Sequence, residues 1–267
     1  MGEHTDAPRG VDISVPNVAR MYDFYLGGKD NYASDREAAR QVLRIAPFTP
    51  ALAWQNRAFM ARAVRYLAGA GVTQFLDIGT GLPTQRNVHE IAQDSAPGAR
   101  VVYVDNDPVV VVHGRALLGV TGNTTVVERD MRRPAEIIDD PQVRQLIDFA
   151  EPVGLLMVSA LHCLSEADEP YRVVATLRDA LAPGSHLVVS HVTGNDEITS
   201  GASAIYDKTS AGMNHRGRDE ILRFFTGFEI LDPGLVRLDE WRPDGALPLI
   251  STAGRDYFYC GVGRKEN

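Results

Sequence analysis

The stretch QFLDIGTG, residues 74–81, decides the fold of this chain. QFLDI has the apolar pattern of a buried β-strand, and Gly79 and Gly81 then allow a tight turn in which backbone approaches a ligand closely. Open parallel sheets bind ligands beyond the carboxyl ends of their strands, where this turn would lie. Because such a turn can also serve only to reverse the chain, its surroundings must decide between the two interpretations.

After this turn, short apolar runs alternate with helical stretches, a pattern typical of a mostly parallel sheet built from strand–helix–strand units. Two late runs, 228–231 and 257–262, favour a closing antiparallel pair. The predicted parallel strands are residues 74–78, 101–105, 124–128, 153–158 and 186–191, and the predicted crossover helices are residues 84–94, 109–118 and 171–181. We therefore expect an α/β fold with a mostly parallel seven-stranded sheet and an antiparallel C-terminal strand.

The chain before residue 71 has helical rather than strand patterns. Residues 17–26 have helical spacing and meet Gly27-Gly28, which suits a helix stop. Ser34 and Glu37 match a capping box and predict a helix to about residue 45. Thr49-Pro50 then has the pattern of an N-cap and first helical position. The helix that follows carries an apolar stripe at Leu52, Phe59, Met60, Ala63, Val64 and Leu67.

Length and composition set the domain organisation that we expect. The chain has 267 residues, 44% of them hydrophobic, which is enough for one large core. We expect a disordered tail at 1–12 and a single domain at 13–267. This domain would consist of an N-terminal helical cap at 13–71 and a Rossmann-like core at 72–267.

Charge and cysteine usage argue against several functional classes. The formal net charge is −8 and the basic residues are scattered, so no nucleic-acid partner is expected. The sequence has no apolar run of about 18 residues and no secretion-signal pattern, so we expect a cytoplasmic protein without a membrane partner. Cys163 and Cys260 lack metal-ligand spacing, and no metal site is expected. The oligomeric state stays open.

Three aspartates lie at or just beyond the carboxyl ends of three successive predicted strands: Asp77, Asp105 and Asp130. A carboxylate at Asp77 would repel the pyrophosphate of a dinucleotide but attract a cationic amine, such as that of S-adenosylmethionine. Asp105 is placed to accept both hydrogen bonds of a ribose diol. Asp130, with Met131 beside it, suits an adenine amine and ring. Each aspartate alone could be a loop or helix cap, but their coincidence with the glycine turn favours S-adenosylmethionine.

Two alternatives stay open at this point. An oxidoreductase that uses a nicotinamide dinucleotide would also place an acid on the ribose, although Thr84 stands where the dinucleotide fingerprint has its last glycine. A non-catalytic module that senses S-adenosylmethionine would share the same pocket. The second alternative survives because the residues identify no indispensable general base.

Four blocks together carry a family resemblance: RMYDFYLGGKDNY at 20–32, FLDIGTGLPT at 75–84, VDNDP at 104–108 and RPDG at 242–245. With them the chain resembles the actinobacterial S-adenosyl methyltransferase family, formerly a domain of unknown function, within the class I methyltransferase superfamily. The resemblance covers nearly the whole chain after residue 12. It implies a class I fold and S-adenosylmethionine as cofactor, without naming an acceptor. Pro83 replaces a third glycine of the broader class and suits the first turn of the next helix.

The resemblance extends the cofactor site beyond the aspartates. It adds Asn106, next to Asp105, and the N-terminal block, where Tyr22 and Lys29 could lie across the cofactor. Lys29 could meet the cofactor carboxylate as a point charge. The same block could instead be only a capped helix that packs on the sheet edge.

Ser159 and Ala160 follow the fourth predicted strand, where this class places residues beside the methyl group. His162 is the candidate general base, and His191 has a weaker claim. Either could merely be a hydrogen-bonded pocket histidine, since proximity can supply much of the rate. The polar segment 193–218 would form a lid over the acceptor. Without an Asn/Asp-Pro-Pro-Tyr/Phe motif, we expect a small-molecule acceptor, and specialised metabolism is one setting that would supply it.

Overall fold

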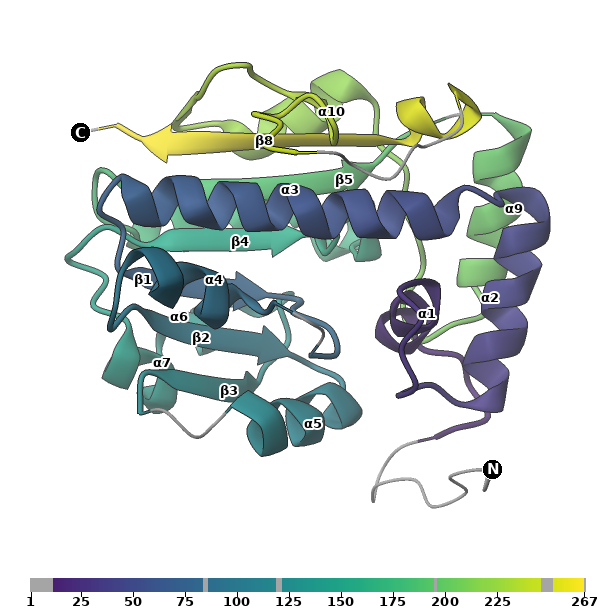
Figure 1. The fold of residues 1–267 in the computed structure, drawn as a ribbon, viewed down its shortest axis with the longest axis horizontal. Coiled ribbons are helices and arrows are strands. Elements are labelled where there is room, and N and C mark those ends of the chain that lie inside the picture. Colours follow the sequence, from purple (N-terminus) through teal and green to yellow (C-terminus); the bar gives the residue numbers. More distant parts are fainter. Residues whose placement is uncertain (1–11, 84–85, 119–121, 195, 246–251, 267) are drawn as a thin grey trace.

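A mixed β-sheet forms the centre of the molecule (Figure 1). The computed structural model describes residues 12–83, 86–118, 122–194, 196–245 and 252–266. Within them the strand order is β3-β2-β1-β4-β5-β8-β6, and neighbours from β3 to β5 are parallel. The bounds are β1 Gln74–Ile78, β2 Arg100–Asp105, β3 Thr124–Glu128, β4 Gly154–Val158, β5 His186–Val192, β6 Phe228–Ile230 and β8 Phe258–Lys265.

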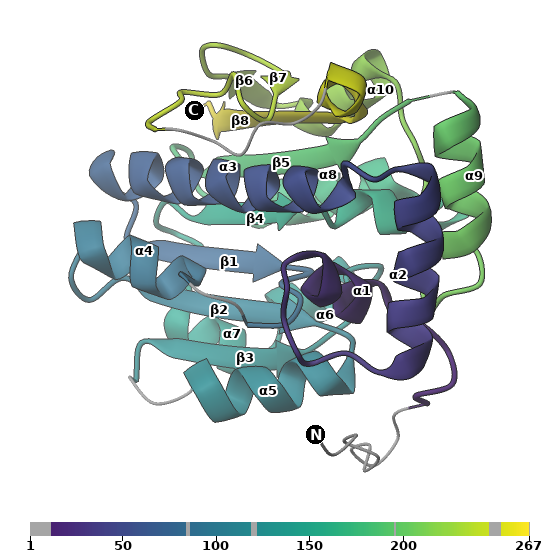
Figure 2. The same cartoon turned by 45° about the vertical axis from the view of Figure 1, so that its right-hand side comes forward.

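The C-terminal strand β8 runs antiparallel to both of its neighbours, β5 and β6. The predicted mostly parallel sheet with an antiparallel last strand is thus confirmed. A further strand, β7 (Val236–Arg237), pairs with the N-terminal half of β8, opposite Tyr259 and Cys260 (Figure 2). Because β7 is so short, no alternating pattern in the sequence indicated it.

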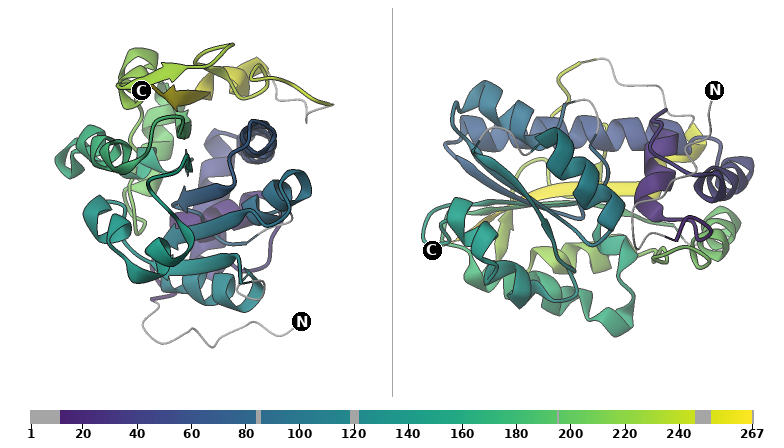
Figure 3. Two further views of the ribbon diagram at one scale, coloured as in Figure 1. Left: turned by 90° about the vertical axis from the view of Figure 1, so that its left-hand side faces the viewer. Right: turned by 90° about the horizontal axis from the view of Figure 1, so that it is seen from below.

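Helices cover both faces of the sheet (Figure 3). The two faces differ because side chains alternate along each strand: Phe75 packs among the residues of one face, and Leu76 and Ile78 among those of the other. The first face carries α3 (Thr49–Gly69), α4 (Val88–Ser95) and α5 (Pro108–Leu118). The second carries α6 (Pro134–Ile138), α7 (Pro141–Leu146), α8 (Pro170–Ala180) and α10 (Arg218–Leu222).

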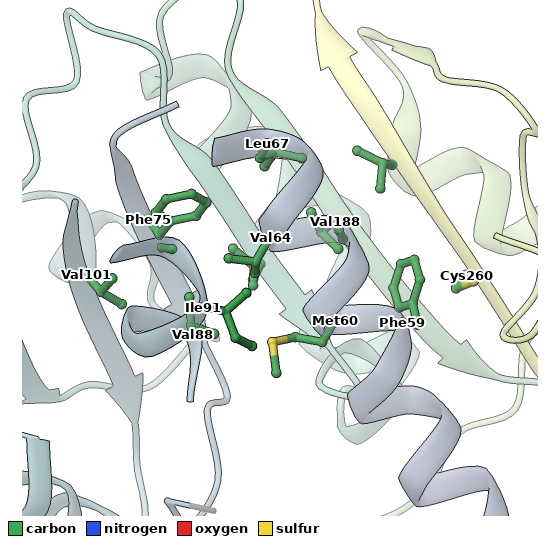
Figure 4. Packing of buried hydrophobic residues seen from close by; sticks show 14 of the residues in the cluster. Phe59, Met60, Val64, Leu67, Phe75, Val88, Ile91, Val101, Val188 and Cys260 are labelled. Carbon is green, nitrogen blue, oxygen red and sulfur yellow. The ribbon is translucent and has the colours of Figure 1, made fainter. Parts of the chain in front are cut away.

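Helix α3 crosses the first face and supplies much of its core (Figure 4). Its predicted apolar stripe is buried as expected, and Phe59, Val64 and Leu67 are fully shielded from solvent. The helix begins at Thr49, so the prediction of Thr49 as N-cap is wrong. Phe48 occupies the N-cap position, and the Thr49 hydroxyl donates to the Ala46 carbonyl at 2.7 Å.

Two other predictions of local structure are corrected. Helix α2 (Ala33–Ile45) begins one residue before Ser34, so Ser34 cannot be its N-cap; Asp35 instead accepts from the Tyr32 N–H at 2.8 Å, and Ser34 donates its hydroxyl to the carbonyl of Ile13. Helix α4 begins at Val88, so Pro83 lies before it and not in its first turn. Thr84 and the tail up to residue 11 lie outside the described residues.

Helices α1 (Val18–Tyr25), α2 and α9 (Glu197–Tyr206) lie beyond the carboxyl ends of the parallel strands (Figures 1 and 2). We call these three helices the cap. Buried hydroxyls of Tyr25 and Tyr206 hydrogen bond at 3.0 Å and join α1 to α9. The Asn17 amide donates to the Ser210 hydroxyl at 2.9 Å and strengthens the same connection. The cap therefore closes over the edge of the sheet where ligands of such folds bind.

Candidate functional site

A cavity of about 530 Å³ lies between the carboxyl ends of the strands and the cap. It brings together all but one of the residues predicted for the site. Lys29 is exposed and is not among the residues that line the cavity. The predicted residues that do line it are Tyr22, Asp77, Gly79, Gly81, Asp105, Asn106, Asp130, Met131, Ser159, Ala160 and His162.

The glycine turn after β1 needs glycine for two different reasons. Gly79 has φ of +72°, and a Cβ there would lie 2.7 Å from the Cβ of Ala160, which is closer than side-chain atoms approach. Gly81 has φ of +68° but has open space around it. Its N–H donates to a carboxylate oxygen of Asp105 at 2.9 Å. The turn is thereby fixed against the end of β2.

Two buried carboxylates face this turn. Asp77 accepts from the Thr80 hydroxyl at 2.9 Å, and Asp105 accepts from the N–H groups of Gly81 and Asp107. Burial raises the pKa of Asp77 to about 6 and that of Asp105 to about 6. Both carboxylates are thus under-solvated in the free protein, and a cation or hydroxyl donor in the cavity would stabilise their charged forms.

Asp107 adds a third acid to this region. Its Oδ1 accepts from the Val109 N–H at 2.8 Å and caps α5, whereas its buried Oδ2 has no hydrogen-bond partner among the described residues. Burial raises the pKa of this carboxyl as well. An unpartnered buried oxygen that belongs to a cavity-lining residue fits a ligand rich in donors.

Asp130 has a different environment from the other acids. Its two oxygens hold the side chain of Arg132 at 2.6 to 3.0 Å, so the carboxylate is already paired. Burial raises its pKa, but the hydrogen bonds from Arg132 outweigh burial and the net pKa is lowered. Met131 lines the cavity beside it and packs against the core of the second face.

A hydrogen-bond network centred on Asn56 of α3 joins the cap to the sheet. The Asn56 amide donates to the Tyr22 hydroxyl at 3.0 Å and to the Ser159 hydroxyl at 2.9 Å. Its carbonyl accepts from the Ser190 hydroxyl at 2.6 Å. Ser159 itself has φ of +56°, a strained value for a residue with a side chain, and the network holds it there.

The sequence analysis missed Asn56, although a signal existed. Asn56 lies four residues from both Leu52 and Met60, so it is a polar residue within the apolar stripe of α3. Arg57 was also missed. It lines the cavity and lies near enough to Asp77 to lower the pKa of that carboxyl. Nothing in the sequence distinguishes Arg57 from the other arginines of the chain.

His162 lies in a short 3₁₀ helix, Leu161–Cys163, directly after β4. It is 3% exposed, and its Nδ1 has no hydrogen-bond partner among the described residues. Burial, followed by the nearby His191, His215 and Arg216, holds its pKa well below the usual value. The imidazole is therefore neutral at physiological pH, with a ring nitrogen available to a ligand.

His191 is held rigidly and does not line the cavity. A guanidinium can only donate, so Nε2 of His191 accepts from Arg216 at 3.1 Å, and its Nδ1 donates to the Val192 carbonyl at 2.6 Å. Burial lowers its pKa to about 3. Both ring nitrogens of His191 are thus engaged, and its ring packs edge-on against that of His162, with ring centroids 5.5 Å apart.

The N-terminal GGKDN block forms a turn around a buried carboxylate. Asp23 accepts from the Asp30 N–H at 3.0 Å and from the Asn31 amide at 2.7 Å. A Cβ at Gly28 would collide with this carboxylate, at 1.9 Å from its Oδ1. The turn explains why glycine stands at this position, and it leaves Lys29 exposed at the surface.

The sheet order, the antiparallel last strand, the glycine turn after β1 and the acid that ends β2 define a class I methyltransferase. Comparison with known families then makes the assignment specific. The family model described as S-adenosyl methyltransferase matches residues 4–266, so the chain belongs to this family. It is an enzyme that uses S-adenosylmethionine, and family membership decides against the nicotinamide-dependent oxidoreductase.

Two solved structures are similar over nearly the whole chain. A candidate methyltransferase from Thermobifida fusca is 42% identical with a TM-score of 0.92, covering 98% of this chain and 100% of that one. A DUF574 family protein from Streptomyces avermitilis is 39% identical with a TM-score of 0.89, covering 95% and 100%. No match was found among the curated proteins. In the described parts of the chain, no helix has the length and apolarity to cross a membrane.

Proposed function

We propose that this enzyme transfers the methyl group of S-adenosylmethionine to a small molecule bound in the cavity, between the cofactor and the cap. The observation that carries this proposal is the continuity of the cavity, which extends from the acids at the strand ends to apolar side chains of α2, α3 and α9. A site of this size, closed by the cap, suits a small acceptor better than a polymer.

The residues of the cavity fit the cofactor. Asp77 would hold its amino group, and Arg57 its carboxylate, because these two side chains are neighbours of opposite charge. Asp105 and Asn106 would bind the ribose hydroxyls. Met131 would pack against the adenine. The remaining predicted cofactor residues, Asp130, Ser159, Ala160 and Tyr22, would complete the pocket, Tyr22 through its bond to Asn56.

S-adenosylmethionine supplies, when bound, an activated methyl group whose carbon–sulfur bond breaks as the acceptor's lone pair attacks, leaving the electron pair on sulfur. His162 would accept the proton that the acceptor releases, since its ring is neutral and Nδ1 is free of protein partners. The Asn56 network would keep Ser159 and the end of β4 in place during transfer. The cap would exclude water from the cavity.

Transfer of a labelled methyl group tests this function. The enzyme is incubated with S-adenosylmethionine labelled in the methyl group and with an extract of the source organism, which is then separated into small-molecule, RNA and protein fractions. We expect the label in the small-molecule fraction, and loss of at least 90% of it, roughly tenfold, with His162→Phe. Label confined to RNA or protein would contradict a small acceptor.

A further inference from the structure

The wall of the cavity on the cap side differs chemically from the wall at the strand ends. Of the described residues that line the cavity, none in the cap or in the segment 207–215 is Lys or Arg. The side chains there are mainly apolar, and Asp207 is an acid at the exposed rim. The apolar members include Val18, Ala19, Val42, Ile198, Ala202 and Met213. A carboxylate or phosphate bound here would be desolvated without a counter-ion, at high cost.

The surroundings of His162 also disfavour a cationic acceptor. Burial and the nearby Arg216 lower the pKa of His162, so the neutral ring offers no counter-ion to a cationic acceptor. Arg216 does not line the cavity and is itself engaged by Glu166 at 2.8 Å, so it cannot serve as a counter-ion for an anionic acceptor. Aliphatic amines are protonated at neutral pH, whereas hydroxyl groups stay uncharged.

The buried Nδ1 of His162, which has no hydrogen-bond partner among the described residues, indicates which group the acceptor presents. A buried polar atom without a hydrogen bond costs free energy, and a hydroxyl of a bound molecule would satisfy it. Resting on the methyl transfer argued above, we propose that the acceptor is an uncharged, largely apolar small molecule that presents a hydroxyl to His162. The hydroxyl oxygen forms the new bond to the methyl carbon, its proton passes to His162, and the product is a methyl ether.

Matched probes test the acceptor class. Naphthol and naphthoate share one ring system and differ in charge at neutral pH, and their affinities are measured by calorimetry on the enzyme saturated with S-adenosylhomocysteine. We expect naphthoate to bind at least about tenfold more weakly than naphthol. Equal affinities, or no binding of naphthol while S-adenosylhomocysteine binds, would overturn this acceptor class. Failure of S-adenosylhomocysteine to bind would count against the proposed function instead.

Two variants test whether the preference for naphthol over naphthoate arises in this cavity. His162→Phe keeps a ring but removes the nitrogen, and should weaken naphthol about fivefold without changing the affinity for S-adenosylhomocysteine. Met213→Lys adds a cation to the segment 207–215 and should raise the affinity for naphthoate about tenfold, whereas the uncharged control Met213→Gln should not. An unchanged preference in both His162→Phe and Met213→Lys would place the probes elsewhere and contradict the proposal.

Discussion

At the scale of single residues, a side chain at the turn after β1 would cause two kinds of strain: an unfavourable positive φ and, at one position only, a steric clash. Both Gly79 and Gly81 have positive φ, but only Gly79 also faces a close neighbour, Ala160. Gly79→Ala should lower the free energy of unfolding by about 3 kcal/mol, from backbone strain plus overpacking. Gly81→Ala should lower it by only about 1 kcal/mol, from strain alone. Denaturant unfolding measures both, and equal losses would disprove the close contact.

The raised pKa values of Asp77 and Asp105 predict how cofactor binding depends on pH. Both carboxyls have a pKa of about 6 in the free enzyme because they are buried, and in the proposed site their charged forms would bind the amine and the ribose. Affinity is therefore fully present above this pKa and is lost as the pH falls through it. Calorimetry with S-adenosylhomocysteine should show a loss of about tenfold per titrating group between pH 7 and pH 5. Asp77→Asn should make this dependence shallower; an unchanged slope would exclude Asp77 as the titrating group.

Arg57 and Lys29 are alternative partners for the cofactor carboxylate. Arg57 lines the cavity, whereas Lys29 is exposed on the turn around Asp23. Arg57→Leu should weaken S-adenosylhomocysteine about tenfold or more, as expected for loss of a charged hydrogen bond. Lys29→Leu is the matched control and should leave the affinity within about twofold. If titration with S-adenosylhomocysteine showed a weaker affinity for Lys29→Leu and an unchanged affinity for Arg57→Leu, Lys29 would be the partner of the carboxylate instead.

At the scale of elements, the cap is held by the hydroxyl pair of Tyr25 and Tyr206. Removal of one hydroxyl leaves the other buried without its partner, so Tyr25→Phe and Tyr206→Phe should each cost about 1 to 2 kcal/mol of unfolding free energy. The double variant should cost less than the sum, because no unpaired hydroxyl is left. Strict additivity of the three values would show that the two hydroxyls do not interact.

The same scale shows what the sequence could predict. Strands β1 and β3 have their predicted bounds, and β2, β4 and β5 differ by one residue at one end, because each is a buried apolar run between turns. Helix starts were less predictable. The Ser34 capping box was wrong by two residues, because the helix begins at Ala33 with Tyr32 as N-cap and Asp35 as the residue that closes the box.

The residues of the candidate site likewise divide into those that a local pattern predicts and those that depend on tertiary contacts. The acids that end β1 and β2 could be predicted, since strand ends in a parallel sheet converge on one edge. Asn56 and Arg57 could not be assigned, because their roles depend on how α3 crosses the sheet. Lys29 was chosen for its charge in a glycine-flanked turn, and only the packing of Asp23 against Gly28 shows that this turn folds on itself.

At the scale of the whole molecule, the sheet and the cap contribute different walls of the cavity. The sheet edge supplies acids and a glycine turn for S-adenosylmethionine, and the cap supplies an apolar chamber over it. The Asn56 network links the two parts through Tyr22 and Ser159. The family assignment makes the chain a methyltransferase, and in the function proposed above its acceptor would enter on the cap side.

Calorimetric titration of the wild-type enzyme with S-adenosylhomocysteine, beside the Asp105→Asn variant, tests the central claim most directly. Asp105 is buried, lines the cavity and ends β2, so its carboxylate should carry the ribose contact. We expect one binding site in the wild type and an affinity lower by about tenfold in Asp105→Asn. A folded wild-type enzyme that binds neither S-adenosylhomocysteine nor S-adenosylmethionine would contradict the account.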